Sequence, residues 1–375
     1  MLVTELRDET QLYDLRPEWD DLLRRSRTAG IFQTWEWNSV YWRYFGVGKQ
    51  LTLLCVRDSD RLVGIAPLKT TLIHGLPLRR VRLLGSRASD YLDLILDQEA
   101  EAEALESVFG WLETNEKRWD ILDLEKIPED SPTLEHWPEL RRRFGWRNSA
   151  SPYGMCPYVP LPRSWDEMRA LLSRKQRSNL SYKERLIRRD FHAEIGPIER
   201  DGIDEGLDAL VRLHTRRWEE RGLPGGLSLE ASRLFLRDIS TLFSKRGWLR
   251  MYGLRLDGEL QSVHYCMAYR DKEYGYIGGW EPSLARYGLG SVLTAHAIRQ
   301  AIEEGLSEFD MLCGDESYKS HWARASHTNH RLIARKGDPR SRLAAALSRA
   351  ERKIGIKTKM LLSRCLAALN IRRSG

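Results

Sequence analysis

The chain has 375 residues, 42% of them hydrophobic, and it carries a formal net charge of +7 at pH 7. At roughly 150 residues per domain, this length predicts two domains, each with its own core. No stretch approaches the roughly 18 apolar residues of a membrane helix, and the first residues lack the pattern of a signal peptide. The five cysteines lie far apart without a Cys-x-x-Cys pair, which argues against a disulfide framework and a zinc site. We therefore expect a cytoplasmic globular protein.

The first half predicts helices, a hairpin, and then a helix between short strands. Helical spacing covers 15–26 and the aromatic-rich segment 32–45, and residues 50–71 form two strands around a turn at 57–60. Short strands at 81–85 and 91–97 precede a helix over 102–116 and a strand over 120–127. The aromatic residues of 32–42 either pack in the core or form a stacking surface for a sugar or peptide acceptor, with Trp35 as the candidate substrate-binding residue.

A cationic segment follows at 164–190. Its apolar spacing predicts two helices with a bend, interrupted by the polar stretch SRKQRSN. The basic side chains, Lys175 and Arg177 among them, form either a solvated helical face or a surface that meets the phosphates of a ligand.

The second half repeats the order of the first. Helices over 203–222 and 231–247 precede a hairpin over 249–270, whose Asp257-Gly258 pair is a strong turn signal. Strands follow at 272–280, 308–313 and 330–336, with an amphipathic helix over 291–305. A weak internal duplication is therefore plausible, and we expect domains at 1–160 and 161–340.

The last segment, 341–375, is predicted to be a basic amphipathic helical tail. From residue 340 to the end there are ten Lys or Arg and one acid, Glu351, so the tail carries most of the excess positive charge. Three roles are open for this segment: packing on the protein or a partner, contact with an anionic membrane surface, or contact with nucleic acid.

A strand, a turn with Gly288 and Gly290, and a helix follow one another over 272–305. Glycines allow the backbone to approach a ligand, and the first amides of a helix are unpaired donors that attract anions. The pattern is neither the dinucleotide fingerprint nor the P-loop, so an anion cradle and an ordinary turn both remain open.

The motifs YIGGWEP, YGLGSVL and FDMLCGDESYKSHWA, in this order, resemble the GNAT acyltransferases, and among them the CelD-like group related to the Fem aminoacyltransferases. The resemblance implies an α/β (α+β) fold of two tandem GNAT-like domains, each a mixed, mostly antiparallel sheet flanked by helices. It also implies an acyl-CoA donor, with acetyl-CoA as the simplest case. The donor would lie along Ile277, Gly278 and Gly279, and its pyrophosphate would lie at Arg286, Gly288, Leu289 and Gly290. The sequence departs from the family pattern because Ala285 stands where a basic residue is usual, one place before Arg286.

The resemblance also suggests residues for direct acyl transfer to an amine. Lys319, after Tyr318, would stabilise the oxyanion that develops on the acyl carbonyl, although a phosphate contact or a solvated lysine is also open. Asp315 and Glu316 are candidates to orient or deprotonate the amine, or are simple caps. In the first half, Asp90 with Tyr91 would face the acceptor, or Asp90 is a capping or turn aspartate. In the second half, His264 would line the same cleft, or it is a satisfied core histidine. His327 and His330 have no third ligand nearby in sequence, so no metal is expected.

We therefore expect an acyl-CoA-dependent N-acyltransferase acting on an amine acceptor, such as a precursor of the cell envelope or of an exopolysaccharide. A Fem-like enzyme that uses aminoacyl-tRNA is the first alternative. A non-catalytic scaffold that binds a nucleotide or a protein partner is the second. The basic tail allows peripheral membrane association in any of the three cases.

Overall fold

The computed structural model describes residues 1–314 and 316–351. The chain divides into two compact units: Met1–Tyr153 together with the chain from Asn329 onward, and Gly154–Thr328. These bounds differ from the expected boundaries at 160 and 340, because the long strands β7 (Arg147–Pro160) and β13 (Ala325–Arg335) each begin in one unit and end in the other. The described residues that follow β13, 336–351, belong to the first unit.

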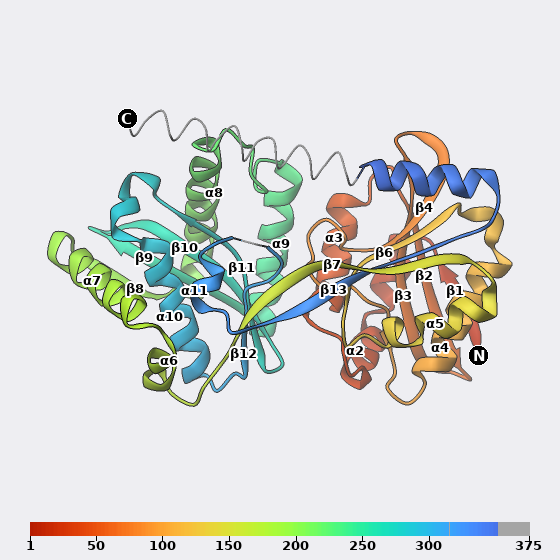
Figure 1. Cartoon of the computed structure of the whole chain (residues 1–375), viewed down its shortest axis with the longest axis horizontal. Coiled ribbons are helices and arrows are strands. Elements are labelled where there is room, and N and C mark those ends of the chain that lie inside the picture. Colours follow the sequence, from red (N-terminus) through yellow and green to blue (C-terminus); the bar gives the residue numbers. More distant parts are fainter. Residues whose placement is uncertain (315, 352–375) are drawn as a thin grey trace. The chain divides into compact units, whose positions relative to one another are not determined.

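The first unit contains a mostly antiparallel sheet in the order β1-β2-β3-β4-β6-β13, in which only β4 and β6 are parallel neighbours. Its core lies between these strands and α4 and α5, with the indoles of Trp119, Trp137 and Trp146 among its members. Figure 1 shows these elements in red to yellow, apart from β13, which is blue. The strands are β1 (Leu2–Leu6), β2 (Gln50–Asp58), β3 (Arg61–Ile73), β4 (Leu76–Leu83), β5 (Ile95–Leu96), which pairs with β3, and β6 (Ile121–Pro128). The helices are α1 (Glu9–Asp14), α2 (Arg16–Arg25), α3 (Trp35–Phe45), α4 (Glu101–Thr114) and α5 (Pro132–Phe144).

The second unit contains a sheet in the order β7-β12-β11-β10-β9-β8, with β11 and β12 as its parallel pair. The helix α10 shares a core with α6 and α7, while α8 packs on β10 and β11 (Figure 1). The strands are β8 (Ala193–Pro197), β9 (Leu249–Leu256), β10 (Glu259–Tyr269), β11 (Lys272–Trp280) and β12 (Glu308–Asp310). The helices are α6 (Trp165–Leu171), α7 (Arg174–Asp190), α8 (Ile203–Glu219), α9 (Glu230–Arg246), α10 (Leu289–Glu303) and α11 (Lys319–Trp322).

Most of the expected elements are present, and the expected α/β fold class is confirmed. The segment 164–190 forms two helices, and the β9–β10 hairpin turns at Asp257 and Gly258, both with positive φ. Two expectations were too long: of 91–97 only Ile95–Leu96 is strand, and the strand expected over 308–313 ends at Asp310. The strand β7 was not expected, because its sequence contains three prolines and a glycine, which are poor strand formers.

The beginning of the expected tail packs on the first unit. A helix runs from residue 339 to the end of the described chain at 351, and its Ala344 and Ala345 are buried against Ile73, Leu78 and Ile121. Polar contacts fix the same helix, since Ser348 donates to Asp123 and Arg80 donates to Glu351. Residues 352–375 lie outside the described part of the chain. Within the described part, no helix is long and apolar enough to cross a membrane.

Candidate functional site

The parallel pair β11 and β12 separates after three residue pairs. Pairing runs from Lys272 opposite Glu308 to Tyr274 opposite Asp310, where β12 ends, whereas β11 continues to Trp280. A register shift against β10 between Tyr265 and Cys266 leaves Tyr276 out of the ladder. A bulge of this kind increases local bending of the strand. The far half of β11 is therefore bent and has no β12 residue beside it.

The helix α10 begins beside this opening with unsatisfied amides. Gly288 has φ +63 and serves as the helix N-cap without a side-chain cap. The carbonyl of Gly288 accepts from the amides of Ser291 and Val292. The amides of Leu289 and Gly290 make no hydrogen bond within residues 1–314 and 316–351. An anion is the natural ligand of such a helix start.

A lysine that the sequence did not single out completes this turn. Lys183, on α7, donates to the carbonyl of Arg286, and a Cβ at Gly288 would lie 3.4 Å from its Cδ. Arg286 itself is exposed; its guanidinium stacks 4.6 Å from the ring centre of Tyr287 and lies 3.7 Å from Asp190. Ala285 offers no basic side chain, and the ammonium group that lies at this turn is that of Lys183, from the cationic segment.

The two adjacent glycines of β11 have different reasons to be glycine. A Cβ on Gly279 would lie 2.8 Å from the backbone nitrogen of His214 on α8, so this glycine is required by packing. A Cβ on Gly278 would meet His264 at an ordinary 3.5 Å. Of the two positions, Gly278 is therefore the one at which the backbone itself is open to a ligand.

His264 lies on β10 directly opposite Gly278, and its place in the expected cleft stays a prediction. Burial lowers the pKa of its imidazole to about 4, so the ring is neutral at physiological pH. It contacts the ring of Phe309, and it makes no hydrogen bond within the described residues. A neutral imidazole in this position can accept a hydrogen bond from a ligand.

Lys319 is buried in the loop after β12. Its Nζ donates to the carbonyls of Leu312 and Cys313, both at 3.0 Å, and pairs with Glu316 at 2.9 Å. Three bonds use all three donors of an ammonium group. Gly314 is needed here because a Cβ would lie 2.2 Å from Glu316 and 2.8 Å from Nζ. Lys319 therefore holds a tight loop in which Leu312 has a positive φ of 59.

Tyr318, the neighbour of Lys319, is 39% exposed, and burial around its hydroxyl raises the pKa to about 12. The charges of Glu316 and Arg217 act on the same hydroxyl. Asp315, the other acid predicted in this loop, lies outside the described residues, so its role stays a prediction.

The C-terminal part of α8 carries polar groups that sequence reasoning missed. His214 is buried, and its Nδ1, the Nε of Arg217 and the indole nitrogen of Trp218 are buried without a hydrogen-bond partner. Burial and the charge of Arg217 lower the pKa of His214 to about 4. The signal in the sequence was HTRRW, in which His214, Arg217 and Trp218 lie at positions i, i+3 and i+4 on one helical face.

A group with metal-ligand chemistry also lies in this unit. Ligand atoms of Glu308, Asp310 and His327 lie within 4.8 Å of one another. His327 is 3.0 Å from Glu308, which raises the pKa of the imidazole, and Lys272 lies 3.2 Å from the same carboxylate. These cationic partners already compensate Glu308, so a metal would have to displace them.

The first-half candidates belong to the first unit. Trp35 is buried, with its indole nitrogen donating to the carbonyl of Leu12 and Arg16 over its ring, which favours core packing over a stacking surface. The backbone carbonyl of Asp90 accepts from Asn329, and its carboxylate lies 3.5 Å from Lys126. The carbonyl of Tyr91 accepts from Gln33. Asp90 and Tyr91 remain predictions as acceptor contacts.

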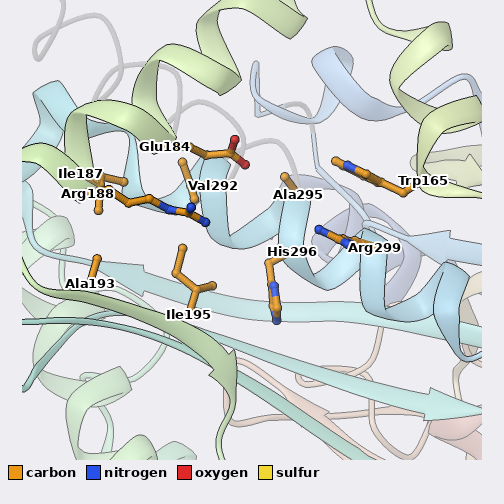
Figure 2. A pocket seen from close by; sticks show the side chains of 10 residues that line it. All are labelled: Trp165, Glu184, Ile187, Arg188, Ala193, Ile195, Val292, Ala295, His296 and Arg299. Carbon is orange, nitrogen blue, oxygen red and sulfur yellow. The ribbon is translucent and has the colours of Figure 1, made fainter.

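A cavity of about 600 Å³ lies between α6, α7, β8 and α10. Figure 2 shows Glu184 and Arg188 reaching over it from α7, while His296 and Arg299 project from α10. The apolar part of its lining comes from Ile187, Ala193, Ile195, Val292 and Ala295. None of the residues predicted from the sequence lines this cavity, which is therefore separate from the β11–β12 opening.

Comparisons with known proteins agree with this geometry. Residues 174–320 match the family model of the acetyltransferase (GNAT) domain. No curated protein matches the sequence. The solved structure of FemX is similar with a TM-score of 0.63 at 12% identity, covering 92% of this chain and 99% of FemX. A conserved protein of unknown function from Bacteroides thetaiotaomicron is similar with a TM-score of 0.56 at 9% identity, covering 89% and 100% of the two chains.

Residues 174–320, within the second unit, therefore match a GNAT acetyltransferase domain, and the fold of the chain is similar to that of FemX. At these identities the solved structures establish the fold alone. The expected relationship to GNAT and Fem proteins is confirmed, as is acyltransferase chemistry in general, whereas the CelD-like grouping stays a prediction.

Proposed function

We propose that the second unit transfers an acyl group from acyl-CoA to an amine acceptor. The observation that carries the proposal is the separation of β11 from β12 beside a helix start whose first amides are unsatisfied. An extended acyl-pantetheine chain fits along the free edge of a strand, and a pyrophosphate fits a helix N-terminus. The acetyltransferase domain match over this unit supports the same assignment.

In this proposal the donor phosphates meet the amides of Leu289 and Gly290 and the ammonium of Lys183. The pantetheine then runs along Ile277 and Gly278, toward the end of β12. The acyl carbonyl would lie near the loop that Lys319 holds. Because all three donors of Lys319 are engaged, direct contact with the acyl oxygen would require one of these bonds to open.

The reaction is a direct attack in which the amine nitrogen forms a bond to the acyl carbon and the carbon–sulfur bond breaks. The amine must be neutral and must lose one proton, and the thiolate of CoA takes up one proton. His264 would accept a hydrogen bond from the amine and orient it. With a pKa of about 4, His264 is a weak base at neutral pH, so orientation is the role that we assign to it.

The acceptor is proposed to approach from the side of α8. Arg217 has a buried Nε without a partner, and no carboxylate forms an ion pair with it in residues 1–314 and 316–351. An acceptor with a carboxylate or phosphate near its amine would satisfy this guanidinium. A sugar or peptide precursor of the cell envelope has this chemistry, in line with the expected acceptor class.

A Fem-like enzyme with an aminoacyl-tRNA donor is the alternative. The exposed cations of α7, which include Arg174, Lys175 and Arg185, favour it because a tRNA backbone needs an extended basic surface. Arg177 does not belong to this surface, since its guanidinium donates to the carbonyl of Leu172 at the end of α6.

The C-terminal residues beyond 351 are proposed to add an electrostatic contact with an anionic membrane surface.

Calorimetry separates the two donors. The full chain is titrated with CoA, acetyl-CoA and bulk tRNA at two salt concentrations. We expect CoA to bind, and Lys183→Met to weaken this binding about tenfold through loss of one charge-assisted hydrogen bond. Arg185→Gln, an exposed charge on the same helix, is the matched control and should leave CoA binding unchanged.

Two results would overturn the CoA assignment. Absence of CoA binding at about 1 mM ligand, far above usual KM values, would exclude it as the donor. Tight, strongly salt-dependent tRNA binding without CoA binding would establish the alternative.

A further inference from the structure

The first unit contains a buried lysine without an acidic partner. The side chain of Lys69, on β3, is 2% exposed. Its Nζ donates to the hydroxyl of Tyr41 at 2.6 Å and to the hydroxyl of Ser86 at 2.8 Å, and it lies 4.5 Å from the centre of the Tyr41 ring. These partners are neutral, so they solvate the ammonium group without balancing its charge.

Further cations surround this lysine. Burial is the largest cause that lowers the pKa of Lys69, and the charges of Arg82 and Lys49 lower it further. Arg87 lies beside Tyr41, whose hydroxyl is reached by the Arg87 amide, and its guanidinium is 6.0 Å from the ring centre of Phe45. We call Lys49, Lys69, Arg82 and Arg87 the Lys69 cluster.

The negative charge near the Lys69 cluster is small. Arg82 pairs with Glu125, and its Nε is buried without a partner. Among the described residues, no carboxylate forms an ion pair with Lys49, Lys69 or Arg87. The four cations of the cluster face the carboxylate of Glu125, and the carboxylate of Asp123 also acts on Arg82.

Elsewhere in the same unit, buried cations are paired. Arg331 forms two hydrogen bonds with Asp123, at 2.6 and 2.7 Å, and Arg80 lies 2.6 Å from Glu351. Taking a charge out of water is costly unless an opposite charge accompanies it. The fold meets this requirement at Arg331 and Arg80 and leaves it unmet at Lys69.

We propose that the Lys69 cluster binds an oxyanion of the phosphate class. A phosphate or pyrophosphate group offers several acceptor oxygens, which match the ammonium of Lys69, the forked guanidinium of an arginine and the hydroxyl of Ser86. The Lys69 cluster reaches the surface of the protein through its other members, because Arg87 is exposed and Lys49 and Arg82 are half-buried. Ser86 beside them is half-buried as well. This site lies within the first unit and is independent of the acyl-donor site proposed for the second.

Such a group can belong to a soluble phosphate ester or to a phospholipid. The depth of Lys69 favours a compact soluble group, because a headgroup held in a bilayer reaches exposed cations more readily than a side chain that is 2% exposed. The Lys69 cluster is therefore inferred to be a subsite for the phosphate group of a small molecule.

Titration of the full chain with inorganic pyrophosphate, by calorimetry and by thermal unfolding, tests the proposal. We expect binding that weakens with salt and an increase of the melting temperature. Arg87→Gln should weaken binding about tenfold, since it removes one charged contact at an exposed position that folding does not need. Arg79→Gln is the matched control: Arg79 is exposed on the same strand as Arg82, and its variant should bind as the natural chain does.

Lys69→Met separates a ligand-binding lysine from a structural one. Methionine fills similar space without charge, so we expect weaker pyrophosphate binding while the melting temperature of the free protein stays the same or rises. A variant that unfolds more easily yet binds pyrophosphate normally would overturn the proposal. Absence of pyrophosphate binding to the natural chain would overturn it as well.

Two further comparisons decide between specific and general attraction. Equal weakening by Arg79→Gln and Arg87→Gln would mean a general electrostatic effect and would contradict the site. Binding to phosphatidylglycerol vesicles, compared with binding to phosphatidylcholine vesicles, tests the phospholipid alternative. Binding of those vesicles through Lys69 and Arg87 without binding of pyrophosphate would exclude the soluble ligand.

Discussion

The helix starts of α4 and α10 occupy corresponding positions in the two units. Each helix joins two parallel strands, β4 to β6 in the first unit and β11 to β12 in the second. Before α4, the carboxylate of Asp97 is buried, accepts from the amide of Glu99, and pairs with Arg25 and Arg61. Neither α4 nor α10 has a side-chain cap, and the turn before α10 contains Gly288 and Gly290.

This difference indicates how the same strand–helix–strand arrangement can be structural in one half of a chain and suited to ligand binding in the other. In the first unit an internal carboxylate, that of Asp97, precedes the helix and is neutralised by two arginines. The second unit supplies glycines and a nearby cation, Lys183, and leaves the anion position to a ligand. The comparison therefore supports the proposal of a donor site in the second unit.

The largest expected effect comes from placing a carboxylate at the start of α10. Gly288→Asp places a carboxylate at the helix N-cap, where aspartate tolerates positive φ and caps well. Because like charges in direct contact cost several kcal/mol, we expect CoA binding to fall about 100-fold while the protein remains folded. Gly288→Asn, which has the same shape without the charge, is the control, and calorimetry should find a much smaller loss. Equal losses in both variants would mean that the position acts through space rather than charge.

The second prediction concerns the loop that follows β12. Lys319→Met leaves two carbonyls without their donor, so we expect the free energy of unfolding to fall by about 2 kcal/mol and turnover to fall with it. Glu316→Gln removes only a half-exposed partner and should cost less than about 1 kcal/mol. Denaturant unfolding and steady-state kinetics measure the two quantities. Loss of turnover in Lys319→Met at unchanged stability would instead support direct contact with the acyl oxygen.

The third prediction distinguishes the neighbouring glycines of β11. Gly279→Ala forces a Cβ against the α8 backbone, and overpacking of this kind costs about 1–3 kcal/mol in the free energy of unfolding. Gly278→Ala has room and should be tolerated in folding, while its methyl group narrows the proposed pantetheine path and weakens CoA binding. A stable Gly279→Ala variant would show that α8 moves freely from β11.

The fourth prediction concerns the pH dependence of stability, which has opposite signs for one buried group in each unit. Burial raises the pKa of Glu273, on β11, to about 8, so the folded state holds a proton that the unfolded state loses above about pH 4.5. Stability is therefore full below that pH and declines as pH rises toward 8, by up to about 1.4 kcal/mol per unit. Glu273→Gln should remove this decline in denaturant titrations between pH 5 and 8.

Lys69 gives the opposite sign in the first unit. Its pKa is lowered in the folded state, so above that lowered value the unfolded chain binds the additional proton, and stability rises with pH until the ordinary lysine pKa is reached. Lys69→Met should remove this rise. A protein in which neither substitution alters the pH dependence would contradict both assignments.

The smallest effect is expected from the end of the chain. Deletion of residues 352–375 keeps Ala344, Ala345, Ser348 and Glu351, which make the contacts with the first unit. The melting temperature should therefore change little, whereas binding to anionic vesicles should be lost if the basic residues provide it. Sedimentation with phosphatidylglycerol vesicles checks the second part, and unchanged sedimentation would exclude a membrane role for this segment.

Local patterns in the sequence predicted the hairpins, the helix after the glycine turn and the two helices of 164–190. They depend on neighbours a few residues apart: the Asp257-Gly258 turn, the helical spacing of α10 and the bend before Arg174 are all visible in short windows. The strand β7 was missed because its prolines oppose strand propensity, and pairing with distant strands overrides this preference.

The sequence by itself determined the composition of the turn before α10, in which Gly288 and Gly290 allow the backbone to approach an anion closely. Only the tertiary structure decided which cation serves that turn, because Lys183 lies more than a hundred positions away along the chain. It likewise decided that Lys319 is engaged by backbone carbonyls and that Lys69 is buried among other cations. The physical reason is the same in each case: a side chain's charge is written in the sequence, but burial and partners, which set what that charge does, arise from contacts between distant segments.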